Sequence, residues 1–151
     1  MTDLTDLKYQ FKKLCIASDH AGFNIKEFIK NFLIKNKISI IDLGPLNDKS
    51  VDYPDYAKKV GNRVRLRKSD MGILVCGSGT GMAISANKIK GIRAAVGYNT
   101  KSTHLSRLHN NANILCLGAR LNNKKNILKM LKIFLQTSFE GGRHSRRIRK
   151  I

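Results

Sequence analysis

Cysteine, glycine and other small residues meet in one short stretch of this chain. Residues 74–88 read LVCGSGTGMAISANK, so Cys76 ends an apolar run and Gly77, Gly79 and Gly81 follow within five positions. A loop of small residues can aim several backbone N–H groups at one point, where they stabilise an anion or a developing oxyanion. A helix that begins beside a cysteine favours the reactive thiolate. The stretch therefore predicts chemistry by Cys76 beside an anion site.

Two nucleotide-binding patterns do not fit this loop. The phosphate-binding loop of nucleotide hydrolases ends in Gly-Lys-Ser/Thr, whereas this loop ends Gly81-Met82-Ala83. The dinucleotide fingerprint needs glycine where Met82 stands and an acidic residue about 20 positions later. No Asp or Glu occurs between Asp70 and Glu140, which also leaves no carboxylate in the second half of the sheet for a magnesium ion. We expect neither a nucleotide cofactor nor a metal.

The two other cysteines predict no special chemistry. Cys15 and Cys116 lie within apolar runs, so we expect both to be buried and inert. Three widely separated cysteines without a Cys-x-x-Cys pair suggest neither a disulfide framework nor a zinc site, and they fit the reducing cytoplasm. The N-terminus lacks an export signal, and no apolar stretch approaches the ~18 residues of a membrane span. A soluble cytoplasmic protein without membrane contact is expected.

The elements that must position Cys76 alternate regularly along the chain. Short apolar runs predict strands, and segments of helical period lie between them. The strands are predicted at 13–18, 38–44, 71–76, 92–98 and 113–119, and the helices at 22–36, 53–66, 82–89, 100–111 and 123–138. This alternation predicts one α/β domain over 1–151, a three-layer α/β/α sandwich with a five-stranded parallel Rossmann-like sheet. A polar N-terminal extension (1–11) and a basic C-terminal tail (141–151) complete the chain.

Polar side chains follow several predicted strands at the edge where such folds bind ligands. Parallel α/β sheets hold ligands outside the carboxyl ends of their strands. Asp19 and His20 follow the first strand, Asp42 ends the second, and Arg120 lies just beyond the fifth. Taken alone, Asp19 is more typical of a helix N-cap and Asp42 of a turn. Together with Cys76, these residues are expected to converge at one edge of the sheet.

The formal charge of +19 is the strongest compositional signal. It suggests nucleic acid, an acidic surface or a phosphorylated substrate. The plainer alternative is that many lysines occupy solvated helix faces without selecting a partner. Aromatic residues make up only 7% of the chain, and no aromatic-rich RNA-binding signature is present. A nucleic-acid-binding module stays open as an alternative function, but no specific nucleic acid is expected.

Five separated blocks of sequence together resemble one enzyme family. The blocks are SDHAGFNIK (18–26), DYPDYA (52–57), GILVCGSGTGMAISANKIKGIRAA (72–95), LSRLHNNANILCLGAR (105–120) and EGGRH (140–144). In order and spacing, from about residue 13 to 147, they resemble the B-type ribose-5-phosphate isomerases, a family that also contains allose-6-phosphate and galactose-6-phosphate isomerases. The resemblance implies a metal-independent aldose–ketose isomerase without a cofactor. It would interconvert D-ribose 5-phosphate and D-ribulose 5-phosphate of the pentose phosphate pathway through a cis-enediol.

The resemblance also implies an assembly and a rival substrate. Family members work as homodimers or homotetramers with their active sites at the subunit interface. Six-carbon sugar phosphates are the alternative substrates within the family. Some members carry a catalytic glutamate at the position of Ser85 instead of the thiol, so Ser85 together with Cys76 indicates the thiol type.

Residue roles follow from the same resemblance. Cys76 matches the base that carries a proton between C1 and C2, and Ser78 matches a hydroxyl that moves the oxygen-bound proton. His109 and Asp19 match groups that assist opening of the furanose ring. The matching substrate-binding residues are His20, Tyr53, Gly77, Gly79, Thr80, Gly81, Asn110, Arg120, Arg143 and Arg147. Among these, Arg143 and Arg147 match a phosphate clamp.

Two further histidines match no such role. His104 is expected at the surface, because side chains of this kind are mostly exposed. His144 adjoins Arg143, and it is expected to contact either phosphate or solvent.

Overall fold

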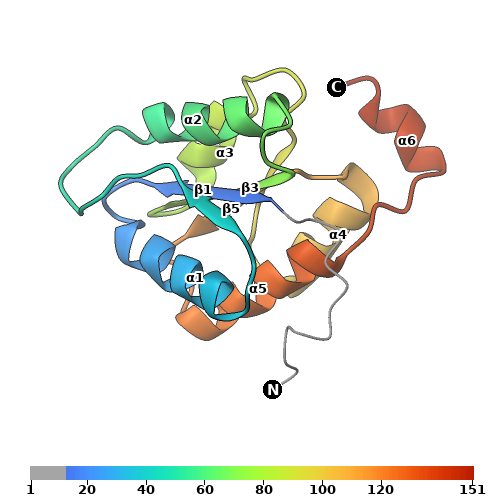
Figure 1. The fold of residues 1–151 in the computed structure, drawn as a ribbon. Helices are drawn as coiled ribbons and strands as arrows, with labels where there is room; N and C mark the ends of the chain where they lie inside the picture. The colour runs from blue at the N-terminus through green and yellow to red at the C-terminus, as the bar shows by residue number, and fades with distance from the viewer. Residues whose placement is uncertain (1–12) are drawn as a thin grey trace.

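A computed structural model describes residues 13–151 and places five parallel strands in one sheet between layers of helices (Figure 1). The strands are β1 (Leu14–Ser18), β2 (Ile40–Asp42), β3 (Met71–Cys76), β4 (Ala94–Val96) and β5 (Ile114–Gly118). The helices are α1 (Phe23–Lys35), α2 (Tyr53–Arg65), α3 (Thr80–Ala86), α4 (Thr100–Asn110), α5 (Lys124–Gln136) and α6 (Arg143–Ile148). The predicted fold class is confirmed. Over the described residues, each helix is too short or too polar to cross a membrane.

The order of the strands creates a crevice beside β3. The sheet runs β2-β1-β3-β5-β4, so the chain moves from β1 to β2 in one direction and then returns to β3 on the other side of β1. Ser18 of β1 pairs with Val75 of β3, which places the carboxyl ends of these two strands side by side. Ligands of open parallel sheets bind at such a reversal point. Asp19 and Cys76 both lie there.

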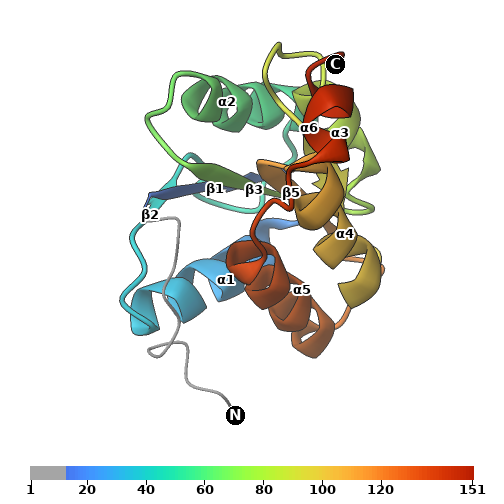
Figure 2. The ribbon, with the colours of Figure 1, turned by 90° about the vertical axis from the view of Figure 1, so that its right-hand side faces the viewer.

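Helices cover both faces of the sheet and bury its strands. In Figures 1 and 2, α2 and α3 lie on one face, whereas α1 and α5 lie on the other, with α4 beside α5. All six residues of β3 are buried, as its continuous apolar run predicts for a central parallel strand. The helical period predicted for 22–36 is confirmed, because Ile29 and Leu33 are buried and Ile25, Phe28 and Phe32 pack against the same core.

The structure corrects several predicted boundaries. β2 covers only Ile40–Asp42 rather than 38–44, and β4 covers Ala94–Val96 rather than 92–98. α3 begins at Thr80, two residues before the prediction, because Gly79 already turns the backbone in a left-handed conformation. The basic tail contains a further short helix, α6, where only a tail was expected. The predicted N-terminal extension lies outside the described residues.

A buried lysine ties α1 to the carboxyl end of β2. Lys26 is fully buried, and its Nζ donates to both carboxylate oxygens of Asp42, at 2.7 and 2.9 Å, and to the Pro45 carbonyl oxygen at 2.9 Å. Asp42 also accepts a bond from Gly44 N, the turn role expected for it. Burial opposes ionisation of Asp42, but the hydrogen bonds from Lys26 and Lys30 outweigh it and lower the pKa of the carboxyl group.

Candidate active site

Cys76 ends β3 and faces the glycine loop. Its side chain is 4% exposed, and its Sγ accepts a hydrogen bond from Gly79 N at 3.1 Å. Gly79 has φ 81°, a left-handed conformation that glycine adopts without a steric penalty. A backbone donor of the glycine loop is therefore aimed at the sulfur itself.

A cleft of about 420 Å³ opens over Cys76 at the carboxyl edge of the sheet. Its walls come from the segments after β1, β3 and β5 and from the start of α2. The lining residues are Asp19, Tyr53, Cys76, Gly77, Ser78, Gly81, Arg120 and Leu121. All except Leu121 are residues that the sequence predicts for the site. Leu121 carried no signal beyond its place next to Arg120.

Backbone hydrogen bonds hold the loops of this cleft together. Ala119 N donates to the Cys76 carbonyl oxygen at 2.8 Å, and Arg120 N donates to the Gly77 carbonyl oxygen at 3.0 Å. These bonds fix the segment after β5 against the glycine loop. A Cβ on Gly77 would lie 3.2 Å from Arg120 Nη1, so the guanidinium stands over the loop, where a cation can attract an anionic ligand.

Asp19 both fixes a turn and lines the cleft. Its carboxylate accepts a bond from Gly22 N at 2.9 Å and so fixes the turn before α1. The N-cap position itself belongs to Gly22, so the N-cap role is held three residues later than the sequence suggests. Its neighbour His20 is exposed, and the ring Nδ1 accepts a bond from Val51 N at 3.3 Å. His20 does not line the cleft.

The two predicted inert cysteines are buried. Burial raises the pKa of the Cys15 thiol to about 11, against smaller opposing effects of Ser69 and Arg63. Burial also raises the pKa of Cys116, with a further contribution from Cys76. Neither thiol ionises near neutral pH, so Cys76 is the cysteine that the cleft presents to a ligand.

Four further predicted residues lie in a second group on α4 and α6, whereas Thr80 begins α3 and lines neither this group's cavity nor the cleft. His109, Asn110 and Arg147 line a cavity of about 290 Å³ together with His144, Ile148 and Ile151. Arg143 and Arg147 are both exposed and lie one turn apart on α6. Of the two expectations for His144, exposure to solvent is wrong, whereas contact with phosphate stays a prediction. His144 is buried, and its ring stacks on His109 with centroids 4.2 Å apart and planes inclined by 14°.

The residues of the cleft and the residues of the second group lie in different parts of the structure. The cavity that contains His109 and the cleft that contains Cys76 share no lining residue. In Figure 1, α6 stands at the right of the molecule, whereas the loop between β2 and α2 that leads to Tyr53 projects at the left. A single copy of the chain therefore does not bring Arg143 and Arg147 to the cysteine.

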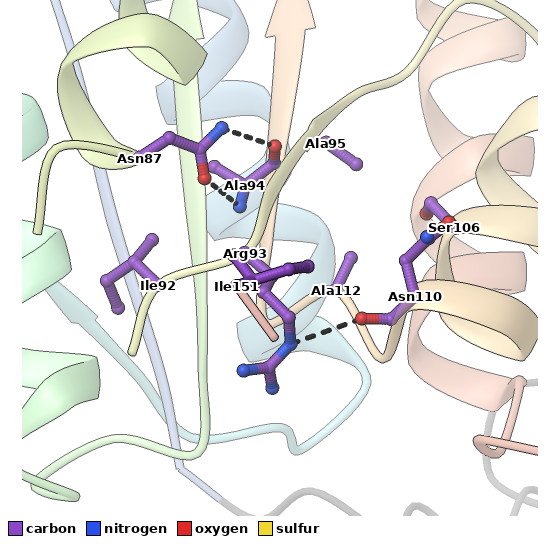
Figure 3. Close-up of a pocket in the computed structure, with 9 residues that line it drawn as sticks. All are labelled: Asn87, Ile92, Arg93, Ala94, Ala95, Ser106, Asn110, Ala112 and Ile151. Atoms are coloured by element: carbon purple, nitrogen blue, oxygen red, sulfur yellow. Dashed lines mark hydrogen bonds between the residues drawn. The ribbon is translucent and has the colours of Figure 1, made fainter. Parts of the chain in front are cut away.

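A third pocket, of about 370 Å³, borders the second group at edge strand β4 (Figure 3). Asn87 bonds both the N–H and the carbonyl oxygen of Ala94 there, and Arg93 Nε donates to the Asn110 carbonyl oxygen at 3.1 Å. Asn110 and Ile151 line this pocket as well as the cavity of the second group. The pocket contains no thiol, and these contacts hold its walls to β4 and the end of α4.

Known proteins are similar to this chain in both sequence and fold. Residues 14–151 match the family model described as Ribose/Galactose Isomerase. Ribose-5-phosphate isomerase B of Escherichia coli (strain K12) is 39% identical over 140 residues, which cover 93% of this chain and 94% of that protein. A ribose 5-phosphate isomerase structure from Thermotoga maritima is 50% identical with a TM-score of 0.90, covering 91% of this chain and 95% of that one.

A further solved structure carries a ligand. Ribose-5-phosphate isomerase B from Mycoplasma genitalium with bound ribulose-5-phosphate is 43% identical, with a TM-score of 0.87 and 91% coverage of each chain. Family model, sequence and fold agree over nearly the whole described chain. The protein is a member of the ribose/galactose isomerase family.

Proposed function

We propose that this chain interconverts D-ribose 5-phosphate and D-ribulose 5-phosphate, with Cys76 as the proton-transferring base. The observation that carries the proposal is the position of Cys76, whose sulfur lines an open cleft and accepts a backbone N–H from the glycine loop. Relatives that match almost the full chain bear the name ribose-5-phosphate isomerase B.

The proposed reaction moves two hydrogens between neighbouring positions. The Cys76 thiolate takes the proton from C2 of the open-chain aldose, and the C–H electrons form the C1–C2 double bond of a cis-enediolate. The charge passes to O1, where backbone N–H groups of residues 77–81 stabilise it. The thiol then returns the proton to C1, and the O2 proton moves to O1. The product is the ketose, and atoms and charge balance.

Side chains around the cleft have distinct tasks in this proposal. Ser78 is exposed beside the glycine loop and moves the proton between O2 and O1. Asp19 and His109 assist opening of the sugar ring, and Asn110 binds the intermediate. Tyr53, His20, Thr80 and Arg120 bind the substrate. Neither a metal nor a cofactor takes part.

The phosphate-binding residues require a second copy of the chain. Arg143 and Arg147 belong to the group on α4 and α6, away from the cleft of their own chain. Two guanidinium groups one turn apart can grip a phosphate through several charge-assisted hydrogen bonds. We therefore propose a homodimer or a dimer-based homotetramer, in which each cleft is completed by His109, Arg143 and Arg147 of the partner. The three free cysteines of the chain favour a reducing compartment, the cytoplasm.

A five-carbon substrate is the better supported of the two sugar sizes. The solved relative from Mycoplasma genitalium binds ribulose-5-phosphate. Allose 6-phosphate is one carbon longer, and a pocket of fixed size discriminates between such substrates through kcat/KM. The chain is expected to give the higher kcat/KM with ribose 5-phosphate.

Replacement of the cysteine tests the proposed base. Cys76→Ala removes the group that carries the proton, so kcat for ribose 5-phosphate should fall by about a hundredfold or more. Cys15→Ala is the matched control, because Cys15 lies on the same face of the sheet but is fully buried away from the cleft. Its kcat should stay close to that of the wild type.

Measurements of folding and of isomerisation rate separate the possible outcomes of that experiment. Circular dichroism and a thermal melt establish that both variants are folded. Comparable isomerisation rates for folded Cys76→Ala and wild type would show that the base is another group. Loss of activity in both cysteine variants to the same extent would also contradict a specific role for Cys76.

A further inference from the structure

Three metal-ligating side chains converge beside the second group. His109 lies at the end of α4, Glu140 precedes α6, and His144 lies in α6. The Glu140 Oε2 is 3.3 Å from His144 Nε2 and 3.7 Å from His109 Nε2. One ligand atom from each residue lies within 4.8 Å of the other two. Two imidazole nitrogens thus face the same carboxylate oxygen.

This set of ligand atoms selects a class of metal ion. Two histidines and one glutamate are the protein ligands of several catalytic zinc sites, in which a fourth position stays open. Magnesium and calcium prefer oxygen ligands, whereas imidazole suits zinc and its divalent transition-metal neighbours. Zn²⁺ is therefore the ion that best fits these side chains.

The surroundings leave access to the cluster. The side chains of Glu140 and His109 are 55% and 36% exposed, and both histidines line the cavity of about 290 Å³ between α4 and α6. Bonds of about 2.0–2.1 Å to zinc require the stacked rings to turn and draw together around the ion. His109, Glu140 and His144 all lie outside the strands, so that adjustment moves no residue of the sheet.

Positive charges nearby work against a cation. Arg147 lines the same cavity, and Arg143 precedes His144 in α6. Glu140 offsets one of these charges. An anion in the fourth position, such as inorganic phosphate, would offset the other, so phosphate is expected to strengthen metal binding.

We propose that His109, Glu140 and His144 form a binding site for Zn²⁺ or a similar divalent transition-metal ion, and that the bound ion inhibits the enzyme. The proposal that the site binds a metal ion rests on the positions of these three side chains alone. The inhibition part rests on the proposed function, in which His109 assists ring opening. A metal ion on its Nε2 removes that nitrogen from the reaction.

Cobalt is the probe for the site, because four-coordinate Co²⁺ absorbs strongly in the visible range. The full chain, freed of metal by a chelator, is titrated with Co²⁺ and then with competing Zn²⁺. The wild type should bind one ion per chain. Glu140→Gln and His144→Asn should each weaken binding by at least about tenfold, by analogy with losses around known metal sites.

His104→Asn is the matched control for these variants. His104 lies on the same helix as His109, is exposed, and contacts Thr137 rather than the cluster. It should bind Co²⁺ as the wild type does. The site is refuted if Co²⁺ does not saturate, if Glu140→Gln binds as tightly as the wild type, or if a cobalt–thiolate band places the ion on Cys76.

Isomerase assays then test inhibition separately from binding. Zn²⁺ should inhibit the wild type and His104→Asn reversibly, with recovery on adding EDTA. Each variant is compared with its own metal-free rate, and Glu140→Gln should need at least about tenfold more Zn²⁺. Equal sensitivity of Glu140→Gln would refute inhibition through this site. Absence of isomerase activity in metal-free wild type would instead refute the proposed function, while the cobalt titration still decides the site.

Discussion

At the scale of single residues, the cleft depends on a glycine as much as on the cysteine. A Cβ on Gly81 would lie 2.7 Å from the ring of Tyr53, well inside van der Waals contact. Glycine at this position therefore lets the aromatic ring close over the start of α3. Tyr53 is 41% exposed, so its ring can move outward without disturbing the core.

Gly81→Ala should displace the Tyr53 ring and leave the fold intact. We expect a higher KM for ribose 5-phosphate and a thermal midpoint near that of the wild type. Tyr53→Ala should raise KM in the same way, because it removes the same wall of the cleft. The double variant should be no worse than Tyr53→Ala alone, since neighbouring groups that act as a unit are not additive. Additive effects on kcat/KM would contradict the proposed contact.

At the scale of elements, the long periodic segments were predictable and the short irregular ones were not. β3 and α1 follow directly from a continuous apolar run and from helical spacing. α3 begins early because Gly79 already turns the backbone. Gly79 N bonds the Cys76 sulfur, and a Cβ on Gly79 would lie 3.1 Å from the backbone of β5, contacts that a local pattern does not contain. α6 has no apolar periodicity of its own, and it packs against α4.

The candidate site likewise has features that the sequence predicts and features that it does not. Position at strand ends predicted that Asp19, Cys76 and Arg120 would share a cleft, and they do. Spacing carries no information on which cleft receives Arg147, because that depends on contacts between distant segments. The buried state of Lys26 was also missed, because one lysine on an amphipathic helix looks like any other.

The Lys26–Asp42 pair gives a stability prediction. Asp42→Asn leaves the buried ammonium without its main counterion, so unfolding free energy at pH 7 should fall by about 3 kcal/mol. Glu27→Gln is the matched control, because Glu27 is 33% exposed and bonds the same lysine; it should cost about 1 kcal/mol or less. Urea unfolding measures both. Equal losses would show that burial does not set the strength of this network.

The stabilisation contributed by the Lys26–Asp42 pair should depend on pH in a definite direction. Because the folded state lowers the pKa of Asp42, its stabilisation is fully present above the unfolded pKa of about 3.9. It is lost as the pH falls through the lower folded pKa. The gap between wild type and Asp42→Asn should therefore shrink below about pH 4.

At the scale of the whole molecule, the division of the site into two groups predicts complementation. Cys76→Ala and Arg147→Ala should each be nearly inactive alone. In dimers reassembled from equal amounts of both, half should be mixed, and one of their two sites should be intact. About a quarter of wild-type activity should return in the ribose 5-phosphate assay. No recovery in verified mixed dimers would show that each site is built from one chain.

The charge of +19 leads to a different whole-molecule expectation. Lysines and arginines spread over many helices favour general electrostatic attraction rather than reading of bases. Binding to duplex DNA should therefore be independent of sequence and weaken steeply between 50 and 200 mM salt. A titration at two salt concentrations with two unrelated duplexes checks this. Tight, salt-resistant binding to one duplex would instead support the nucleic-acid-binding alternative.

The three cysteines on one face of the sheet also make the protein easy to label selectively. Cys15 and Cys116 have no exposed surface, whereas Cys76 opens into the cleft. A small maleimide should therefore attach to a single position in the native protein. The fraction left unlabelled then reports how much of the cleft is occupied, which offers a direct screen for compounds that compete with the sugar.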